Sequence, residues 1–322
     1  LVLFIAFTVR YNALYYPVIS SVAFFLFRER IFLKALGFVF GLLLIAVFMQ
    51  FTSNRYYELT GQRQFSPFSG WQVANNAMYA YRFVADKDVK KVPSRFEQLD
   101  KMVRNYFDTT RNNPKHPEEN ETASTVYMWT PTAPLQKYMA NKFKKDSTVS
   151  SIKRWATVAP LFEEYGKYLI SQYPLTFAKH YLWPNTLKYC SPPVEFLETY
   201  NMGSDSVHIV AQHWFGYKSN KVRSYFKDFR IHILDVYPIL TGSINMAFLC
   251  GVLGLIVLKG NRRPPLIFPA VSLAACFWII NFTFSVFAAP IALRFQLFPV
   301  IIFLSFSLLI IEYIWKIATA KA

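Results

Sequence analysis

Two arginines interrupt apolar stretches of the chain, and both could bind an anion. Arg294 lies within APIALRFQLFPV, residues 289–300, and Arg10 lies within FTVRYNALYYPVIS, residues 7–20. An arginine at membrane depth costs about 2.5 to 3.5 kcal/mol on insertion scales, so it is usually buried in a bundle, paired, or beside a polar cavity. A guanidinium group can hold a phosphate through two parallel hydrogen bonds. We therefore interpret Arg10 and Arg294 as lipid-phosphate-binding residues; the alternative for Arg294 alone is snorkelling to the headgroups.

The acids that could activate an acceptor are less conspicuous. Glu58, Asp205 and Asp235 are the carboxylates that we consider as general bases, although each fits an ordinary surface or interface position better. Within the apolar stretches only Glu312 occurs, near one end, and proton or sodium coupling normally needs acids inside the membrane. This pattern disfavours an ion-coupled transporter.

Metal and soluble-enzyme motifs give no further site. The five histidines and three cysteines have no metal-ligand spacing, and the chain contains no glycine-rich phosphate loop, HExxH or GxSxG motif. We predict no metal-ligand set and no certain cofactor. Participation of a divalent metal stays open.

The elements that must position these residues are membrane spans. The chain of 322 residues is 53% hydrophobic, 18% aromatic and only 17% charged. Because a bilayer core of about 30 Å needs roughly 20 helical residues, a few long apolar stretches can each cross it. Residues 1–27 are interrupted by polar residues and a proline, which predicts the end of one helix, a turn and a second short helix. The chain starts inside an apolar run, so we expect it to be the C-terminal part of a longer protein. The clear spans are 35–51, 236–258, 266–289 and 295–315.

Short basic loops give the orientation of these spans. Lysines and arginines cluster at 28–34, 259–263 and 316–321, and all three clusters can face the cytoplasm together. The long region between the first and second clear spans then lies outside the cytoplasm. Both arginines fall near the outer membrane surface in this topology.

This reasoning predicts an all-α multi-pass membrane protein made of three parts. A largely helical extracytoplasmic domain, rich in aromatic residues, is inserted between two groups of spans. The parts are 1–51, transmembrane helices that lack the N-terminal part of the bundle; 52–235, the extracytoplasmic domain; and 236–322, three C-terminal transmembrane helices.

Helical periodicity is clearest in three segments of the middle domain. Ser94 and Glu97 form a capping-box pattern, and Phe96, Leu99 and Val103 follow at helical spacing. The many Tyr and Trp residues of this domain either fill its core or lie at headgroup level, or they line a groove that stacks on sugar rings. The sequence leaves both interpretations open. The predicted helices are 70–84, 94–107 and 150–173.

Three segments of the chain resemble parts of the GT-C class of membrane glycosyltransferases. That class includes dolichyl-phosphate-mannose protein mannosyltransferases and bacterial aminoarabinose transferases. Residues 7–20 are similar to a pattern of short helix, basic residue and short helix, with Tyr11 where many members have Pro. Residues 163–189 are similar to a segment with Pro after a polar residue that precedes the return to the membrane. The stretch around Arg294 is similar to a late helix in which a few residues and a Pro follow an arginine.

The resemblance implies a GT-C-like transmembrane helix bundle and a polyprenyl-phosphate-linked sugar donor. It also implies an active site at the outer membrane surface and inversion at the anomeric carbon by an acidic general base. In that class the acid lies in the first outer loop, so we expect the catalytic carboxylate upstream of Leu1. The arginines would stabilise the departing lipid phosphate, and Tyr15, Tyr16 and Trp183 are candidates for the border of the substrate pocket.

The leading hypothesis is therefore a glycosyltransferase of a bacterial inner membrane, with its large domain facing the periplasm. Its expected partners are the lipid bilayer, a polyprenyl-phosphate-linked sugar, and an acceptor protein, lipid or glycan, but no nucleic acid. The alternative is a non-catalytic membrane subunit of an envelope or secretion assembly whose outer domain docks partners. A flippase for a lipid-linked glycan should show repeated halves, and the sequence shows none.

Overall fold

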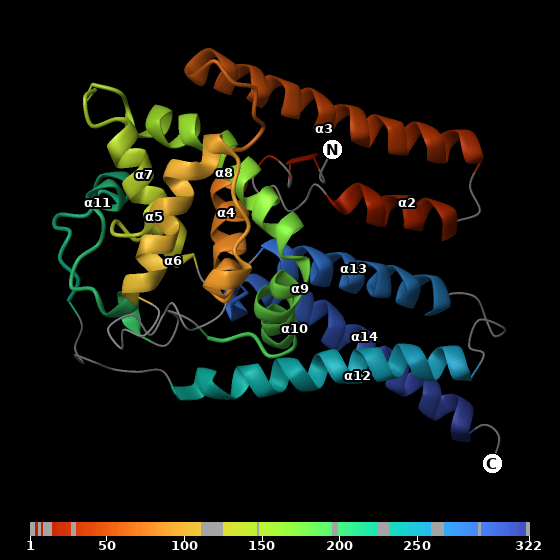
Figure 1. The fold of residues 1–322 in the computed structure, drawn as a ribbon. Helices are drawn as coiled ribbons and strands as arrows, with labels where there is room; N and C mark the ends of the chain where they lie inside the picture. Colours follow the sequence, from red (N-terminus) through yellow and green to blue (C-terminus); the bar gives the residue numbers. More distant parts are fainter. Residues whose placement is uncertain are drawn as a thin grey trace. The chain divides into compact units, whose positions relative to one another are not determined.

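A computed structural model describes the chain (Figure 1). Its regular elements, among the residues described, are helices, and Ser206 and Lys221 form an isolated β-bridge. The prediction of an all-α protein is thus confirmed for the residues described. Two compact units form: the first is Leu1–Thr186 with Ala275–Pro290, and the second is Leu187–Ala274 with Ile291–Ala322. The structure describes residues 4–5, 8, 15–26, 30–110, 125–146, 148–194, 199–223, 232–258, 267–288 and 291–319.

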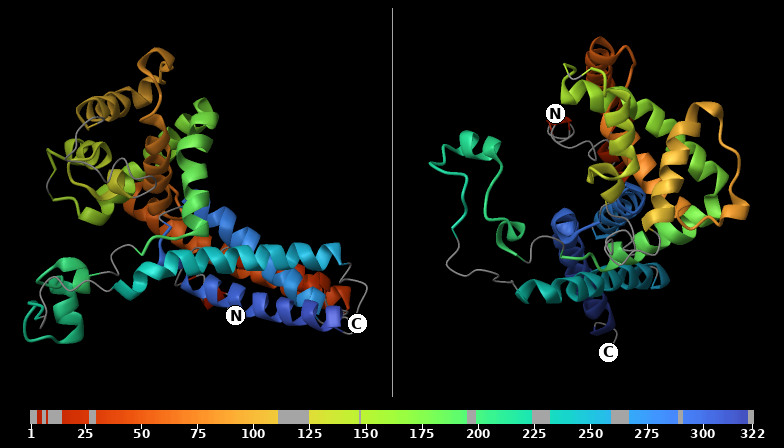
Figure 2. Two further views of the ribbon diagram at one scale, coloured as in Figure 1. Left: turned by 90° about the horizontal axis from the view of Figure 1, so that it is seen from below. Right: turned by 60° about the vertical axis from the view of Figure 1, so that its left-hand side comes forward.

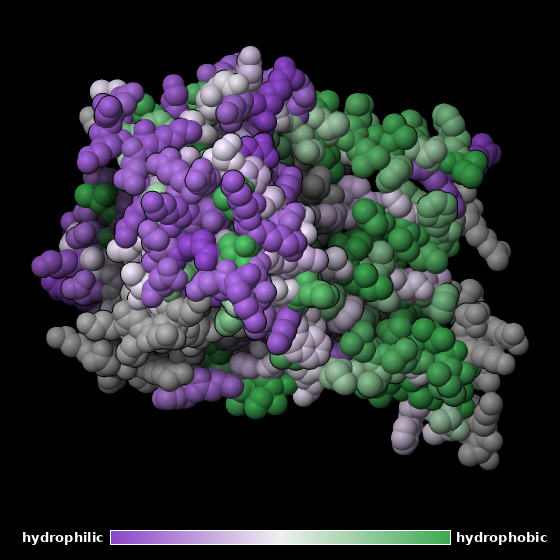
Figure 3. All heavy atoms as spheres, in the orientation of Figure 1, coloured by the Kyte–Doolittle hydropathy of each residue, from purple (hydrophilic) through white to green (hydrophobic). Residues whose placement is uncertain are grey.

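Four helices in the described ranges are long and apolar enough to cross a membrane. They coincide with the four predicted spans and support the interpretation of the chain as a membrane protein. Figure 3 shows hydrophobic side chains on the outer faces of several of these helices. The side of the membrane that each end faces stays a prediction. The helices are α3 (Ile31–Thr60), α12 (Tyr237–Val257), α13 (Ile267–Ala288) and α14 (Leu293–Thr319).

Helix α3 continues for nine residues beyond its predicted span, which ended at Phe51. At about 1.5 Å per residue, this polar extension adds about 14 Å. Gly61 ends the helix in the left-handed region at φ 74°, and its N–H donates to the carbonyl of Tyr57 at 2.8 Å. The short helix α2 (Tyr16–Leu26), which corresponds to the predicted second short helix, packs the ring of Phe24 against Gly37 of α3.

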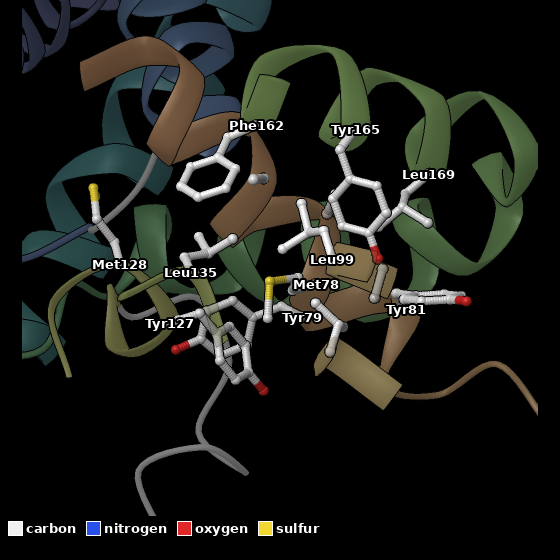
Figure 4. Packing of buried hydrophobic residues seen from close by; sticks show 14 of the residues in the cluster. Met78, Tyr79, Tyr81, Leu99, Tyr127, Met128, Leu135, Phe162, Tyr165 and Leu169 are labelled. Atoms are coloured by element: carbon white, nitrogen blue, oxygen red, sulfur yellow. The ribbon is translucent and has the colours of Figure 1, made fainter. Parts of the chain in front are cut away.

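The hydrophobic core of the first unit lies among α4 (Pro67–Tyr81), α5 (Ser94–Thr110) and α8 (Ser151–Gln172). These correspond to the three predicted helices. The shorter helices α6 (Val126–Trp129) and α7 (Pro134–Lys142) also contribute to it. Figure 4 shows the aromatic and aliphatic side chains of this core meeting between the helices.

Helices α4 and α8 approach each other closely because glycine occupies the contact. A Cβ atom on Gly166 would lie 2.7 Å from the backbone nitrogen of Ala74. Pro160 lies inside α8 and has no N–H, which removes the usual donor to the carbonyl of Ala156. The side chain of Gln64 donates to that carbonyl at 2.9 Å instead, so the interruption of the helix is satisfied from outside it.

Most aromatic rings of this core are fully enclosed, which confirms the core-filling interpretation for them. Trp71 lies edge-on to Phe162 with ring centroids 4.8 Å apart, and Tyr79 contacts Tyr127 at 4.7 Å. The largest fully buried side chains of this core are Trp71, Tyr79, Phe96, Phe107, Tyr127, Phe162, Tyr165 and Tyr181.

A helical run with one wide turn follows α8. It consists of α9 (Pro174–Phe177), a π-helical turn η4 (Ala178–Leu182) and α10 (Trp183–Cys190). The N–H of Trp183 donates to the carbonyl of Ala178, five residues back, and Pro184 follows with no N–H to continue the regular pattern.

The remaining described elements are short. A 3-10 turn, η2 (Asp86–Asp88), lies between α4 and α5. The second unit contains η5 (Tyr200–Gly203), α11 (Ile209–Phe215) and η6 (His232–Val236) before α12 begins.

Candidate functional site

Arg294 lies in the first turn of α14, where its side chain is exposed. Its guanidinium carbon lies 4.8 Å from the ring centroid of Phe295. The N–H of Leu293 donates to the carbonyl of Pro193 at 2.9 Å. The beginning of α14 is therefore tied to the segment that follows α10, and Arg294 is presented from a fixed backbone.

Helices α12 and α14 pack in parallel within the second unit. The rings of Phe248 and Phe303 lie 5.2 Å apart, and further along both helices Gly254 lies next to Ile314. The residue numbers of the contacting pairs increase in the same direction along both helices. The N-termini of α12 and α14 therefore lie at the same end. Two spans separated by one other span should run in the same direction, so this agrees with the alternation predicted for successive spans.

Buried polar side chains lie at the end where α12 and α14 begin. Thr241 and Asn245 near the start of α12 and Gln296 in the first turn of α14 are all buried. The side chain of Asn245 donates to the carbonyl of Thr241 at 3.1 Å. Helix N-termini attract negative charge, and Arg294 adds a full positive charge at the same end. The arrangement suits an anion such as a phosphate, but amides and a hydroxyl cannot act as a general base near neutral pH.

A second polar cluster, within the first unit, surrounds the C-terminal end of α13. Asn76 donates to the carbonyl of Phe287 at 2.9 Å and Tyr181 donates to the same oxygen at 3.0 Å. Asn185 donates to the carbonyl of Val286 at 3.0 Å, and Gln72 donates to that of Ala288. The last carbonyls of a helix have no hydrogen-bond donors within the helix. These four side chains provide the donors for the end of α13.

The wide turn η4 helps to position this cluster. Tyr181 lies within η4 and Asn185 one turn later in α10, and both are fully buried. Single π-helical turns often occur at functional positions. The observed role of these side chains is to donate to the last carbonyls of α13 within the first unit.

The predicted pocket residues have different environments. The ring of Tyr15 packs against Phe284 of α13 with centroids 5.0 Å apart, although the residue is 39% exposed. Trp183 is 61% exposed at the start of α10. Tyr16 begins α2, but its side chain lies outside the described residues, as does the whole of Arg10. The pairing of Arg10 with Arg294 therefore stays a prediction.

The three candidate general bases are all exposed. Glu58 pairs with Arg55 at 3.0 Å, one turn away in α3. Asp235 lies 3.2 Å from the ring of His232 within η6. Asp205 contributes its backbone carbonyl to a hydrogen bond from Val222 at 2.7 Å. Each has the environment of an ordinary surface acid.

A buried acid that the sequence analysis did not identify lies in α5. Asp100 is only 6% exposed and accepts hydrogen bonds from the hydroxyls of Tyr81 at 3.0 Å and Tyr165 at 2.9 Å. Burial raises the pKa of Asp100, while the two tyrosine hydroxyls and nearby Arg104 oppose that rise. Its hydrogen bonds lie inside the helical core, which favours a structural role. The available signal was its position one turn after Phe96 on the apolar face of the predicted helix.

Metal ligands and known relatives add no further assignment. Among the described residues, no three side chains of His, Cys, Asp or Glu gather as a metal site would require. No family model, curated protein or solved structure matches the chain.

Proposed function

We propose that this protein is a membrane glycosyltransferase of the GT-C type, which transfers a sugar from a polyprenyl-phosphate donor to an acceptor at the outer membrane surface. One observation carries the proposal. Arg294 is exposed in the first turn of α14, at the end of the second unit where α12 also begins and where Thr241, Asn245 and Gln296 are buried. A lipid-linked phosphate is an anion that would reach the end of a membrane-spanning helix.

In the proposed reaction, Arg294 stabilises the negative charge that accumulates on the lipid phosphate as the bond to the sugar breaks. Arg10 is the second proposed phosphate ligand. A carboxylate removes the proton from the acceptor hydroxyl or amine as that group attacks the anomeric carbon. In the GT-C class this acid lies in the first outer loop, and Glu58, Asp205 and Asp235 are the candidates within this sequence.

The proposal is tested by replacing Arg294 with Ala and with Lys in the full chain. Binding of undecaprenyl phosphate to the purified protein is measured by native mass spectrometry, and transfer is measured with the sugar-bearing lipid that copurifies. We expect R294A to lose about 100-fold or more in transfer rate, as when one charge-stabilising donor is removed. R294K should retain part of the activity, because lysine keeps the charge but not the two-pronged geometry.

A matched control is Lys316→Ala in the last turn of the same helix, where Lys316 pairs with Glu312 at 2.5 Å. It also removes one exposed cation from α14, but at the opposite end, and should leave transfer unchanged. A folded R294A protein that binds undecaprenyl phosphate and transfers sugar like the original chain would exclude the proposed phosphate contact.

A second candidate function is a non-catalytic membrane subunit whose helical domain docks partners. The observation that favours it is the exposure of Glu58, Asp205 and Asp235, with Glu58 paired with Arg55 and Asp235 in contact with the ring of His232. Mass spectrometry of the lipids and proteins that copurify separates the two candidates. A sugar-bearing polyprenyl lipid supports the transferase, whereas a stoichiometric protein partner without such a lipid supports the subunit.

A further inference from the structure

Residues 205–222 form a closed loop, which we call the clamped loop. The N–H of Val207 donates to the carbonyl of Asn220 at 2.8 Å, and the N–H of Val222 donates to that of Asp205 at 2.7 Å. Together with the β-bridge between Ser206 and Lys221, these bonds hold the two ends of the loop side by side. Figure 2 shows it in teal as a hooked segment that carries the short helix α11.

Both ends of α11 are capped, so its conformation is locally fixed. The ring of His208 accepts a hydrogen bond from the N–H of Val210 at 3.2 Å. Gly216 ends the helix in the left-handed region at φ 66°, and the N–H of Tyr217 donates to the carbonyl of Gln212 at 2.9 Å. The chain therefore orders a seven-residue helix that an isolated peptide of this length would not keep.

This ordered helix exposes large apolar side chains. Val210 and Trp214 lie four residues apart and share a face, and Phe215 continues that face. Their exposed fractions are 63%, 81% and 63%. The ring of Tyr217 stacks on that of Phe215 at 5.5 Å and is itself 51% exposed. A built loop that presents a contiguous apolar face marks an interaction surface rather than an unordered linker.

Charge and position indicate what this face contacts. From residue 206 to residue 223 the sequence contains no acid, and Lys218, Lys221 and Arg223 are all exposed. Thirteen residues separate Arg223 from the first residue of the span-capable helix α12. Trp and Tyr are enriched where bilayers meet water, and basic residues beside a span are attracted to anionic headgroups.

We propose that the clamped loop is a membrane-surface anchor, in which the apolar face of α11 enters the headgroup region of the bilayer that α12 spans and the three cations bind anionic phospholipids. The loop contributes a second contact with that bilayer, in addition to the spans. The inference does not depend on sugar transfer, because it uses only the apolar face, the cations and the neighbouring span.

Spin labels on the full chain in lipid nanodiscs test this placement. Cys190, Cys250 and Cys276 are replaced with Ala, and single labels are attached at Trp214→Cys or, as a matched control, at His213→Cys. Residue 213 neighbours residue 214 in the sequence, carries a polar side chain, and lies about 100° around α11 from it. We expect the label at 214 to lie about 5–10 Å below the headgroup boundary, more accessible to oxygen than to a water-soluble nickel complex. The label at 213 should be accessible to the nickel complex.

Equal access of the nickel complex to both labels overturns the proposal, because the loop would then lie in water. A label at 214 that is shielded from both oxygen and the nickel complex also overturns it, since a protein surface would then cover α11.

Hydrogen exchange of the unlabelled full chain provides a test that needs no cysteine substitution. We expect the amides of residues 209–217 to exchange at least tenfold more slowly in nanodiscs with anionic phospholipid than in purely zwitterionic ones. Each cation near an anionic surface contributes about fivefold in binding. The variant K218S/K221S/R223S should lose this lipid dependence. Identical exchange of the original chain in both lipids contradicts the anchor.

Discussion

Helices α3 and α4 belong to the same unit but place their side chains in opposite ways. In α4, 11 of 15 residues are buried, including the neutral polar residues Asn75 and Asn76. In α3, which is twice as long, Ile45 is the buried residue among those described, and large apolar side chains such as Leu43 and Phe51 are more than half exposed.

The contrast separates apolar composition from burial inside the protein. Helix α4 has small and polar residues among its aromatic ones and is enclosed by other helices, whereas the first two thirds of α3 are apolar on every side. A helix that is apolar all round must lie in a large core or in lipid. Because the apolar part of α3 is exposed by its own protein, we expect the surrounding medium to be the bilayer. Its last nine residues, from Thr52 to Thr60, return to a polar composition.

The largest effect should come from adding a methyl group where α4 and α8 are in close contact. In Gly166→Ala the new Cβ would lie 2.7 Å from the backbone of Val73 and Ala74, and backbone atoms cannot move aside as a flexible side chain can. We expect a loss of about 3 kcal/mol or more in the stability of this core. Thermal unfolding of the full chain in nanodiscs, followed by circular dichroism, should show a lowered transition.

Gly41→Ala is the control for that substitution. Gly41 lies inside α3, and no atom lies within 4 Å of the position that an alanine Cβ would occupy there. Alanine should therefore leave stability unchanged or raise it by about 0.5–1 kcal/mol. If both variants unfold at the temperature of the original chain, the close contact between α4 and α8 does not exist in solution.

A charge placed on the apolar half of α3 tests the second region. Leu43 is 56% exposed, so Leu43→Arg would be harmless on a surface in water. In lipid it should cost about 2.5–3.5 kcal/mol, measured as a reduced fraction of residues 31–60 inserted when this segment is tested within a host membrane protein. Asn54→Arg, on an exposed position of the polar extension, should have little effect. Equal insertion of the two variants would mean that residues 31–51 do not span the membrane.

The sequence was informative wherever one segment carries its own pattern. The spans follow from the length of apolar runs, and α5 follows from Phe96, Leu99 and Val103, which are fully buried as their spacing predicts. The sequence predicted the span that ends at Phe51 but not where the helix ends, because the loss of apolar character at Thr52 marks the end of the apolar segment and not the end of α3.

Features that join distant segments could not be predicted in this way. Tyr181 and the carbonyl that it contacts are 106 residues apart, and Tyr165 and Asp100 are 65 residues apart. A local pattern can place Asp100 on an apolar face but cannot identify the hydroxyls that solvate it. The proposed pair of Arg10 and Arg294 has the same difficulty and stays a prediction.

The smallest expected effect concerns how the hydrophobic core among α4, α5 and α8 accommodates Asp100. Tyr165→Phe removes a hydroxyl that stabilises the ionised form of Asp100, and a hydrogen bond to a charged group contributes about 1.5–3 kcal/mol. We expect a loss at the lower end of that range near neutral pH. Loss of this donor should raise the pKa of Asp100 further, because the hydroxyl of Tyr165 acts to lower it.

The sign of the pH dependence follows from the raised pKa of Asp100. A carboxyl whose pKa is higher in the folded than in the unfolded state holds its proton more tightly when folded. It therefore favours the folded state below its unfolded value of 3.8, and this advantage is lost as the pH rises through the raised folded value. Since Tyr165→Phe raises the folded pKa further, its destabilisation should be small in acid and grow as the pH rises through that window, measured by urea unfolding at several pH values.

Tyr168→Phe is the matched control, because it removes a hydroxyl from the same helix that donates to the carbonyl of Lys91 at 3.1 Å at an exposed position. Its effect should be smaller and nearly independent of pH. A pH-independent loss for Tyr165→Phe would mean that Asp100 is uncharged throughout the range. The core would then resemble the spans, in that neither would contain a buried ionised carboxylate, and the contrast between the two regions would rest on packing alone.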